Sequence, residues 1–210
     1  MEIILFIPIL FFSIILHEFA HGFVAYRLGD DTAYYSGRLT LNPLKHIDPV
    51  GTLAIPTLCA LFGWPMFGWA RPVPVNPLRL SSPRKDMGKV AVAGPAVNLL
   101  LAIICAVLLK IVLLVQGSLS DTMLKSAFAF FQYGILVNVM LAVFNLIPIP
   151  PLDGGRIMTA LLPVRAALAY EQLFARFGMW IVIGLILTGA VRYIILPPAY
   201  FILNLISKIL

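Results

Sequence analysis

The stretch from His17 to His21 reads His-Glu-Phe-Ala-His and lies inside an apolar run that begins at Ile3 and continues past Val24. Residues four apart share one face of a helix, so the two histidines would stack about 6 Å apart along the axis, with Glu18 beside them. Two neutral imidazoles can occupy two positions of a tetrahedral zinc site, and the glutamate can accept a proton from water that the metal activates. This pentad predicts hydrolysis, and its apolar setting predicts hydrolysis inside a bilayer.

The composition also indicates a membrane protein. Hydrophobic residues make up 61% of the 210 residues and charged residues only 11%, whereas soluble domains contain about 25% charged residues. We expect an all-α, polytopic membrane protein with one domain over residues 1–210 and five or six transmembrane or re-entrant segments around the zinc site. The first apolar stretch carries the pentad and lacks a basic n-region, so we expect it to be retained and not cleaved. Basic residues fall between apolar segments, which favours membrane orientation over nucleic-acid binding.

Four stretches are long enough to cross about 30 Å of hydrocarbon, namely residues 3–26, 90–115, 126–147 and 178–196. Residues 50–63 are apolar but shorter, and a proline-broken run that is not expected to be helical follows them. The tail after Pro197-Pro198 fits a half-span or an interfacial helix. Residues 34–41 alternate in polarity and predict short β-like segments near the membrane surface, because open strand edges are not tolerated in lipid.

A third zinc ligand is expected among few acidic residues. Glu171 is expected to lie in a polar linker between helices, in a solvated role. Asp153 follows a full span, in a stretch from Asn145 to Gly155 whose prolines end the helix and whose glycines allow close backbone approach. An acid at this depth is costly unless it has a partner, so Asp153 is the candidate ligand, with capping of a following helix as its alternative.

Counting membrane crossings tests whether Asp153 can meet the pentad. The spans at 90–115 and 126–147 go out and back, so Asp153 returns to the side of residue 89. Residues 28–89 must then make no net crossing, which predicts that residues 50–70 dip into the membrane and return. Most Lys and Arg residues share this side, so it should be cytoplasmic, with the N-terminus outside and the active site towards the cytoplasm.

Three motifs in order resemble the site-2 proteases, zinc metalloproteases that cleave within membranes. They are the pentad, residues 94–98 (Gly-Pro-Ala-Val-Asn) and the stretch of residues 145–155. Residues 37–52 and 68–77 look like the compact subgroup that lacks PDZ and CBS modules. The resemblance implies a catalytic core over about residues 1–160, followed by C-terminal helices over about residues 164–210. It also implies Zn²⁺ as cofactor and transmembrane proteins as substrates in regulated intramembrane proteolysis, in the plasma membrane of a prokaryote. The implied residue roles are zinc ligation by His17, His21 and Asp153, base catalysis by Glu18, and contact with the scissile peptide by Asn145.

Several alternatives stay open. Asn98 either contacts substrate at the active site or hydrogen-bonds between helices. His46 could be a spare ligand, but its surroundings favour ordering a turn. Trp64 and Trp69 are expected as interfacial anchors. Strand-like pieces at 34–41 and 71–75 could pair with an unwound substrate.

The other function classes are a membrane zincin with a glutamate as third ligand, which no glutamate in a predicted span would provide, and an inactive scaffold or transporter-like protein. The substrate and the oligomeric state are not identified by the sequence.

Overall fold

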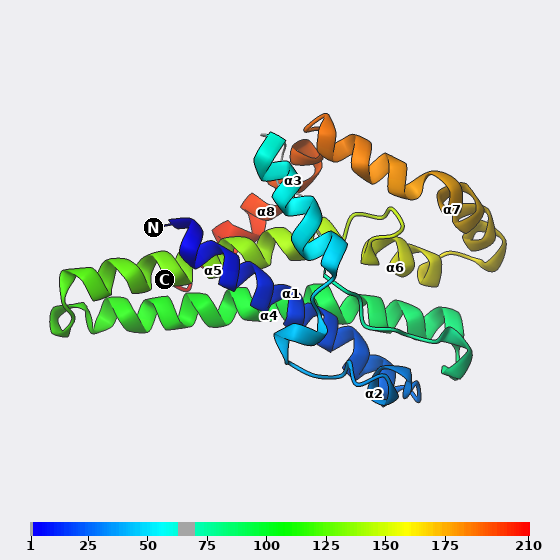
Figure 1. The fold of residues 1–210 in the computed structure, drawn as a ribbon, viewed down its shortest axis with the longest axis horizontal. Helices are drawn as coiled ribbons and strands as arrows, with labels where there is room; N and C mark the ends of the chain where they lie inside the picture. Colours follow the sequence, from blue (N-terminus) through cyan, green and yellow to red (C-terminus); the bar gives the residue numbers. More distant parts are fainter. Residues whose placement is uncertain (1, 63–69) are drawn as a thin grey trace.

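The computed structural model describes residues 2–62 and 70–210, and this part of the chain consists of helices and their connections (Figure 1). In chain order the elements are α1 (Glu2–Arg27), α2 (Thr32–Tyr35), η1 (Pro43–Lys45), η2 (Pro49–Ala54), α3 (Ile55–Phe62), η3 (Pro77–Arg79), α4 (Pro83–Leu114), η4 (Gln116–Ser118), α5 (Asp121–Asn145), α6 (Asp153–Leu161), α7 (Val164–Leu187) and α8 (Val191–Ser207).

The long helices α4 and α5 form the centre of the molecule and lie side by side (Figure 1). Helix α1 packs across both of them, α6 packs on α4, and α8 packs on α5. The central contact uses small residues of α4, Ala102 and Ala106, which are fully buried against branched residues of α5 such as Val139. Small side chains let apolar helices approach closely in a lipid environment, where dispersion contacts must hold them together.

Four helices in the described residues are long and apolar enough to cross a membrane: Phe6–Arg27, Pro83–Leu114, Asp121–Asn145 and Val164–Leu187. The first three confirm the predicted spans apart from their exact ends. The fourth prediction, residues 178–196, is wrong in its bounds because the helix begins at Val164 and ends before Gly189. That glycine adopts a positive φ of 69°, a conformation that ends helices. The apolar pattern continues past this break, so hydropathy alone does not reveal it.

Helix α8 is too short to be one of these candidate spans, and Pro197 and Pro198 lie inside it. We expected a short half-span or interfacial helix after these prolines, but the helix begins before them, at Val191. The expected total of five or six segments stays a prediction, since the described residues hold four candidate spans and two shorter apolar helices.

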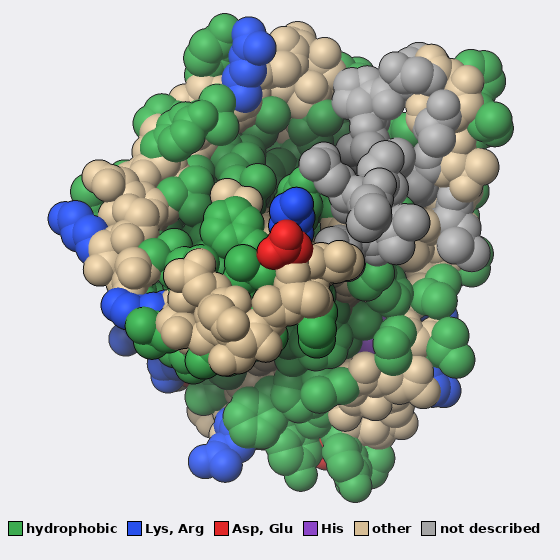
Figure 2. Space-filling view, turned by 90° about the vertical axis from the view of Figure 1, so that its left-hand side faces the viewer, with side chains coloured by type: hydrophobic (Ala, Val, Ile, Leu, Met, Phe, Trp, Pro, Cys, Tyr) green, Lys and Arg blue, Asp and Glu red, His purple; other side chains and the backbone are tan. Residues whose placement is uncertain are grey.

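The outer surface has the composition expected of a chain surrounded by lipid. Large apolar side chains such as Trp180, Phe201 and Leu187 are about two-thirds exposed. Hydrophobic side chains cover most of the face shown in Figure 2, where Lys and Arg are scattered. Burying such side chains in hydrocarbon is favourable, so the exposed surface of these helices indicates a multi-pass membrane protein.

The strand expected at residues 34–41 is not formed. Residues 32–35 form the short helix α2 instead, with Ala33 fully buried and its carbonyl accepting hydrogen bonds from the N–H groups of Arg38 and Leu39. Gly37 then turns the chain at a positive φ of 64°. Residues 71–75 are not helical, as predicted, but they form no strand pairing in the described structure.

Residues 49–62 form two consecutive helical elements, η2 and α3, which are too short for a full crossing. Residues 63–69, including Trp64 and Trp69, lie outside the described residues, so their predicted anchoring role is not tested. The prediction that residues 50–70 re-enter the membrane likewise stays a prediction.

The predicted return of the chain after α5 is confirmed. Helix α6 packs against α4 so closely that a Cβ added at Gly88 would lie 2.4 Å from Cβ of Ala160. The start of α4 and the segment after α5 therefore lie together, as the count of crossings required. Which side of a membrane this end faces stays a prediction.

Candidate metal centre

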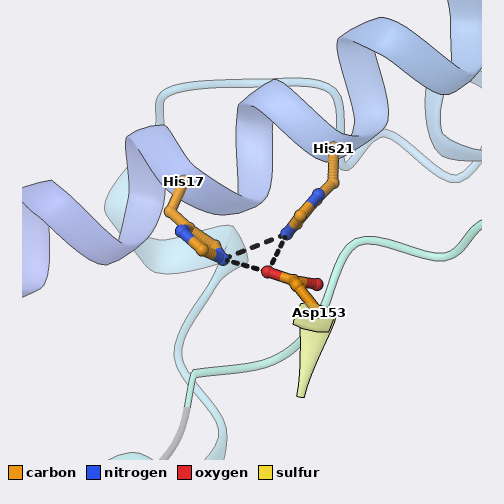
Figure 3. A group of neighbouring side chains, drawn as sticks. All are labelled: His17, His21 and Asp153. Atoms are coloured by element: carbon orange, nitrogen blue, oxygen red, sulfur yellow. Dashed lines mark hydrogen bonds and ion pairs between the residues drawn. The ribbon is translucent and has the colours of Figure 1, made fainter. Parts of the chain in front are cut away.

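Both histidines of the pentad project from the same face of α1, as their spacing predicted. The two side chains are buried, and their Nε2 atoms lie 3.0 Å apart (Figure 3). Asp153 comes from the first turn of α6 and points at the same place (Figure 3). Its Oδ2 atom lies 3.1 Å from Nε2 of His17 and 3.1 Å from Nε2 of His21. The three predicted ligands therefore converge from two elements that are far apart in sequence.

The connection from α5 to α6 brings Asp153 to this point. A Cβ at Gly154 would lie 2.3 Å from the Leu146 carbonyl oxygen, and one at Gly155 would lie 2.5 Å from the nitrogen of Pro150. Larger residues at either glycine would push α6 away from the end of α5. The expectation that these glycines permit close backbone approach is confirmed.

A backbone acceptor determines the tautomer of His21. Its Nδ1 lies 2.7 Å from the carbonyl oxygen of Val90 on α4. A carbonyl can only accept, so Nδ1 carries a proton, and in the neutral imidazole Nε2 then presents its lone pair to Asp153 and His17.

The tautomer of His17 is determined by a chain of two asparagines. Asn138 Nδ2 donates to the carbonyl of Gly134 (2.9 Å), so Asn138 Oδ1 is left to accept a hydrogen bond from Asn98 Nδ2 (2.9 Å). Asn98 Oδ1 then lies 2.6 Å from His17 Nδ1 and must be the acceptor. His17 thus also presents the lone pair of Nε2, and the orientation originates at a backbone carbonyl of α5.

The resulting donor set fits zinc. Two imidazole nitrogens and a carboxylate oxygen face one another at 3.0–3.1 Å, an arrangement that either a shared proton or a metal ion between them would stabilise. Asp153 Oδ2 is buried and has no hydrogen-bond donor in the described residues. Ligand atoms about 2.0–2.1 Å from a tetrahedral zinc ion lie about 3.3 Å apart, and three protein ligands leave one position open for chemistry. The observed spacing is close to this value.

Helix α4 closes the site at Gly94. A Cβ at this position would lie 2.5 Å from Nε2 of both His17 and His21. Only glycine therefore lets α4 pass this close to the ligand atoms, which gives the first residue of the motif at 94–98 a physical reason.

Glu18 is half-buried beside the ligands on α1, and its Oε2 accepts a hydrogen bond of 2.9 Å from the backbone N–H of Val73. This contact joins residues 55 positions apart. The candidate base is therefore held by a defined partner beside the metal ligands.

The remaining predicted residues lie in different surroundings. Asn98 is fully buried, and its bonds to His17 and Asn138 favour a role in orienting the ligand. Its predicted contact with substrate is not tested. Asn145 lies in the last turn of α5, where its Nδ2 donates to the Leu141 carbonyl, and its substrate contact also stays a prediction.

His46 is fully buried and its Nε2 lies 2.8 Å from the Thr40 carbonyl, so it orders a turn. It does not belong to the metal-binding group found among the described residues. Glu171 requires a correction, because it lies inside the candidate span α7 and not in a linker between helices. Its side chain is exposed and does not belong to the ligand group, so a site with glutamate as third ligand gains no support.

Three contributors to the site were not predicted from the sequence. Asn138 had a detectable signal, because a polar amide inside a predicted span needs a partner. The Val90 carbonyl and the Val73 N–H are backbone groups, which no residue pattern distinguishes.

Comparison with known proteins decides the family. The sequence model of peptidase family M50 matches residues 5–187 of this chain. The chain belongs to peptidase family M50, the site-2 protease family. It is 41% identical over 187 residues to "Putative zinc metalloprotease YwhC" of Bacillus subtilis (strain 168), covering 88% of this chain and 81% of YwhC.

More distant relatives match as well. The chain is 34% identical over 186 residues to "Putative zinc metalloprotease Rip2" of Mycolicibacterium smegmatis, covering 86% of this chain but 65% of Rip2. It is 25% identical over 182 residues to "Zinc metalloprotease MJ0392" of Methanocaldococcus jannaschii, covering 41% of that protein. No solved structure gives a significant match. Family membership and the donor set together identify this M50 protein as a zinc metalloprotease.

Proposed function

We propose that this protein is an intramembrane endopeptidase that cleaves membrane-embedded segments of other membrane proteins. The observation that carries the proposal is the convergence of His17, His21 and Asp153 within 3.1 Å of one another, with two of them in the candidate span α1. Ionisable residues at membrane depth are costly, so their presence favours a function there. The candidate base Glu18 lies on the same helix.

Each residue of the site has a separate role in the proposed reaction. His17, His21 and Asp153 would hold the zinc, which supplies polarisation of a peptide carbonyl and a lowered pKa for nearby water. Glu18 accepts the proton of the attacking water and later transfers it to the leaving amine. Asn98 keeps His17 in the ligating tautomer throughout. Asn145 is proposed to hydrogen-bond the substrate near the scissile peptide.

A helical substrate must unwind before its backbone can reach this site. Strand addition is proposed along residues 71–75 only, because residues 34–41 form a helix and turns. Prolines at 72 and 74 have no N–H, and the N–H groups of Arg71 and Val73 are already bonded. A substrate strand would therefore pair mainly with carbonyl oxygens of this segment.

The proposed orientation of the protein in the membrane follows from the distribution of its Lys and Arg residues. By the crossing count from the sequence, most Lys and Arg residues share the side of residue 89, so this side is proposed to be cytoplasmic, in the plasma membrane of a prokaryote. The active site then lies towards the cytoplasm. The partners are the lipid bilayer and transmembrane protein substrates.

The proposal can be tested with purified protein in liposomes that also contain single-span proteins. Candidate substrates would be those that accumulate uncut in membranes of cells producing only the Glu18→Gln variant. Mass spectrometry of the products should locate the cut inside the apolar segment. Cuts confined to soluble loops would contradict the proposal.

Measuring the zinc content of variants tests which residues hold the metal and which residue acts as the base. Wild-type protein and Glu18→Gln should each bind about one zinc per chain, whereas His17→Ala and Asp153→Ala should lose it. Glu18→Gln should cleave nothing. Full proteolysis by this variant would exclude Glu18 as the base, and a folded, metal-free wild-type chain would favour a scaffold.

A further inference from the structure

Residues 71–76 form an extended strap that crosses α1 beside the metal centre. Three bonds hold it: Arg71 N–H to the His46 carbonyl (2.9 Å), Arg38 Nη1 to the Pro72 carbonyl (2.9 Å), and Asn76 N–H to a carboxylate oxygen of Asp30. His46 and Asp30 are themselves fully buried. The strap is therefore fastened at both ends.

The middle of the strap reads Pro72-Val73-Pro74, and this order determines which backbone donors it offers. Proline has no N–H, so Val73 supplies the only backbone donor of the three residues. That donor is directed at Oε2 of Glu18, at 2.9 Å. The flanking prolines keep the backbone extended and offer no competing donor.

The side chain of Val73 sets how closely the strap approaches α1. It is buried and lies over Gly22, one turn beyond Glu18, where an added Cβ would come within 2.7 Å of Val73 Cγ1. Glycine at 22 thus allows the contact distance that places the N–H on the carboxylate.

We propose that the backbone N–H of Val73 is a positioning group for the catalytic base. It holds Oε2 of Glu18, so that Oε1 remains available to take the proton from the attacking water. This inference rests on the proposed role of Glu18. A carboxylate on a side chain with three rotatable bonds would otherwise sample several orientations, and losing a hydrogen bond to a charged group should slow the chemical step by roughly ten- to hundredfold.

The first test compares Val73→Pro with Val73→Ala. Val73→Pro removes the N–H while suiting extended backbone, and Val73→Ala keeps the N–H while removing the side-chain methyls. We expect kcat to fall roughly ten- to hundredfold in Val73→Pro and by less than about threefold in Val73→Ala, with zinc content and KM unchanged in both. Equal kcat values, a change confined to KM, or loss of zinc in Val73→Pro would each overturn the proposal.

A rescue experiment covers the case in which Val73→Pro does not fold. Gly22→Ala should push the strap outwards through the contact with Val73 Cγ1 and lower kcat while zinc stays bound. Adding Val73→Ala removes that methyl and should restore kcat, because the N–H can return to Glu18. An unchanged kcat in Gly22→Ala, or no recovery in the double variant, would contradict the proposal.

A thermal double-mutant cycle needs no substrate and so separates this proposal from the proposed function. Val73→Pro should lower the Tm more in the wild type than in Glu18→Ala, whereas Val73→Ala should lower it equally in both. Additive Tm changes for Val73→Pro would show that the N–H and the carboxylate are not coupled. If coupling is seen but no membrane substrate is cut, the intramembrane function fails and the contact stands.

Discussion

The two asparagines behind His17 should control zinc affinity in a graded way. Asn98→Leu removes the acceptor for His17 Nδ1, and Asn138→Leu removes only the acceptor that orients Asn98. Leucine is close to asparagine in shape, so both changes mainly delete hydrogen bonds. Asn98 is 0% exposed and Asn138 is 2% exposed, so water cannot replace the lost partners.

The two variants should lose different amounts of zinc affinity. Removing the direct partner of a ligating histidine typically weakens metal binding about 10–100-fold. Removing Asn138 costs one hydrogen bond between neutral groups, about 0.5–1.5 kcal/mol, which corresponds to about two- to twelvefold in zinc affinity if all of it acts through His17. Each variant should also lose about 1–3 kcal/mol of stability, because a buried polar partner is left unsatisfied.

Competition with a chromophoric zinc chelator in detergent micelles measures the affinities. Asn145→Leu is the matched control, because its amide donates to the Leu141 carbonyl of its own helix and does not bond to the ligand residues in the described structure. Its zinc affinity should equal that of the wild type. The reasoning would be refuted if Asn138→Leu bound zinc as tightly as the wild type, or more weakly than Asn98→Leu.

Three further predictions concern the glycine at the metal site, a buried carboxylate outside it, and the metal itself. Gly94→Ala should abolish zinc binding because its Cβ would lie 2.5 Å from the ligand nitrogens, whereas Gly184→Ala, with nothing within 4 Å, should not; metal analysis of purified protein distinguishes them. Burial raises the pKa of Asp30, but hydrogen bonds to its carboxylate outweigh this and hold the pKa below its ordinary value. Ionised Asp30 should therefore stabilise the fold above about pH 4 and lose this effect as the pH falls through its lower folded-state pKa, so that Asp30→Asn lowers the Tm at pH 7 and weakens its acid dependence. Chelation of zinc should stop proteolysis by the wild type, and added zinc should restore it, while Glu18→Gln should stay inactive throughout.

The grouping of His17, His21 and Asp153 could be predicted because it depends on local spacing and on span lengths. The interval between His17 and His21 is a helical repeat, and counting apolar stretches returned Asp153 to the same end of the bundle. Residue spacing and span length are properties of the individual segments and do not depend on how the segments pack. The predicted span at 178–196 failed because apolar residues continue on both sides of Gly189, and only the packed chain shows that the helix breaks there.

The expected strand at residues 34–41 failed for a related reason. An alternating pattern describes which faces are apolar, but it does not supply a neighbouring strand. Here Ala33 is buried instead and its carbonyl takes up the following N–H groups, so the segment closes into a turn.

By itself the sequence indicated a membrane protein, and it predicted a site of two histidines, a glutamate and an aspartate at one end of the spans. Only the tertiary structure decided how they are held. The His21 tautomer depends on the Val90 carbonyl, that of His17 depends on Asn98 and Asn138, and Glu18 is bonded to the Val73 N–H. The physical reason is that backbone donors and acceptors are nearly the same at every residue, so their partners depend on packing between distant segments, which the order of side chains does not reveal.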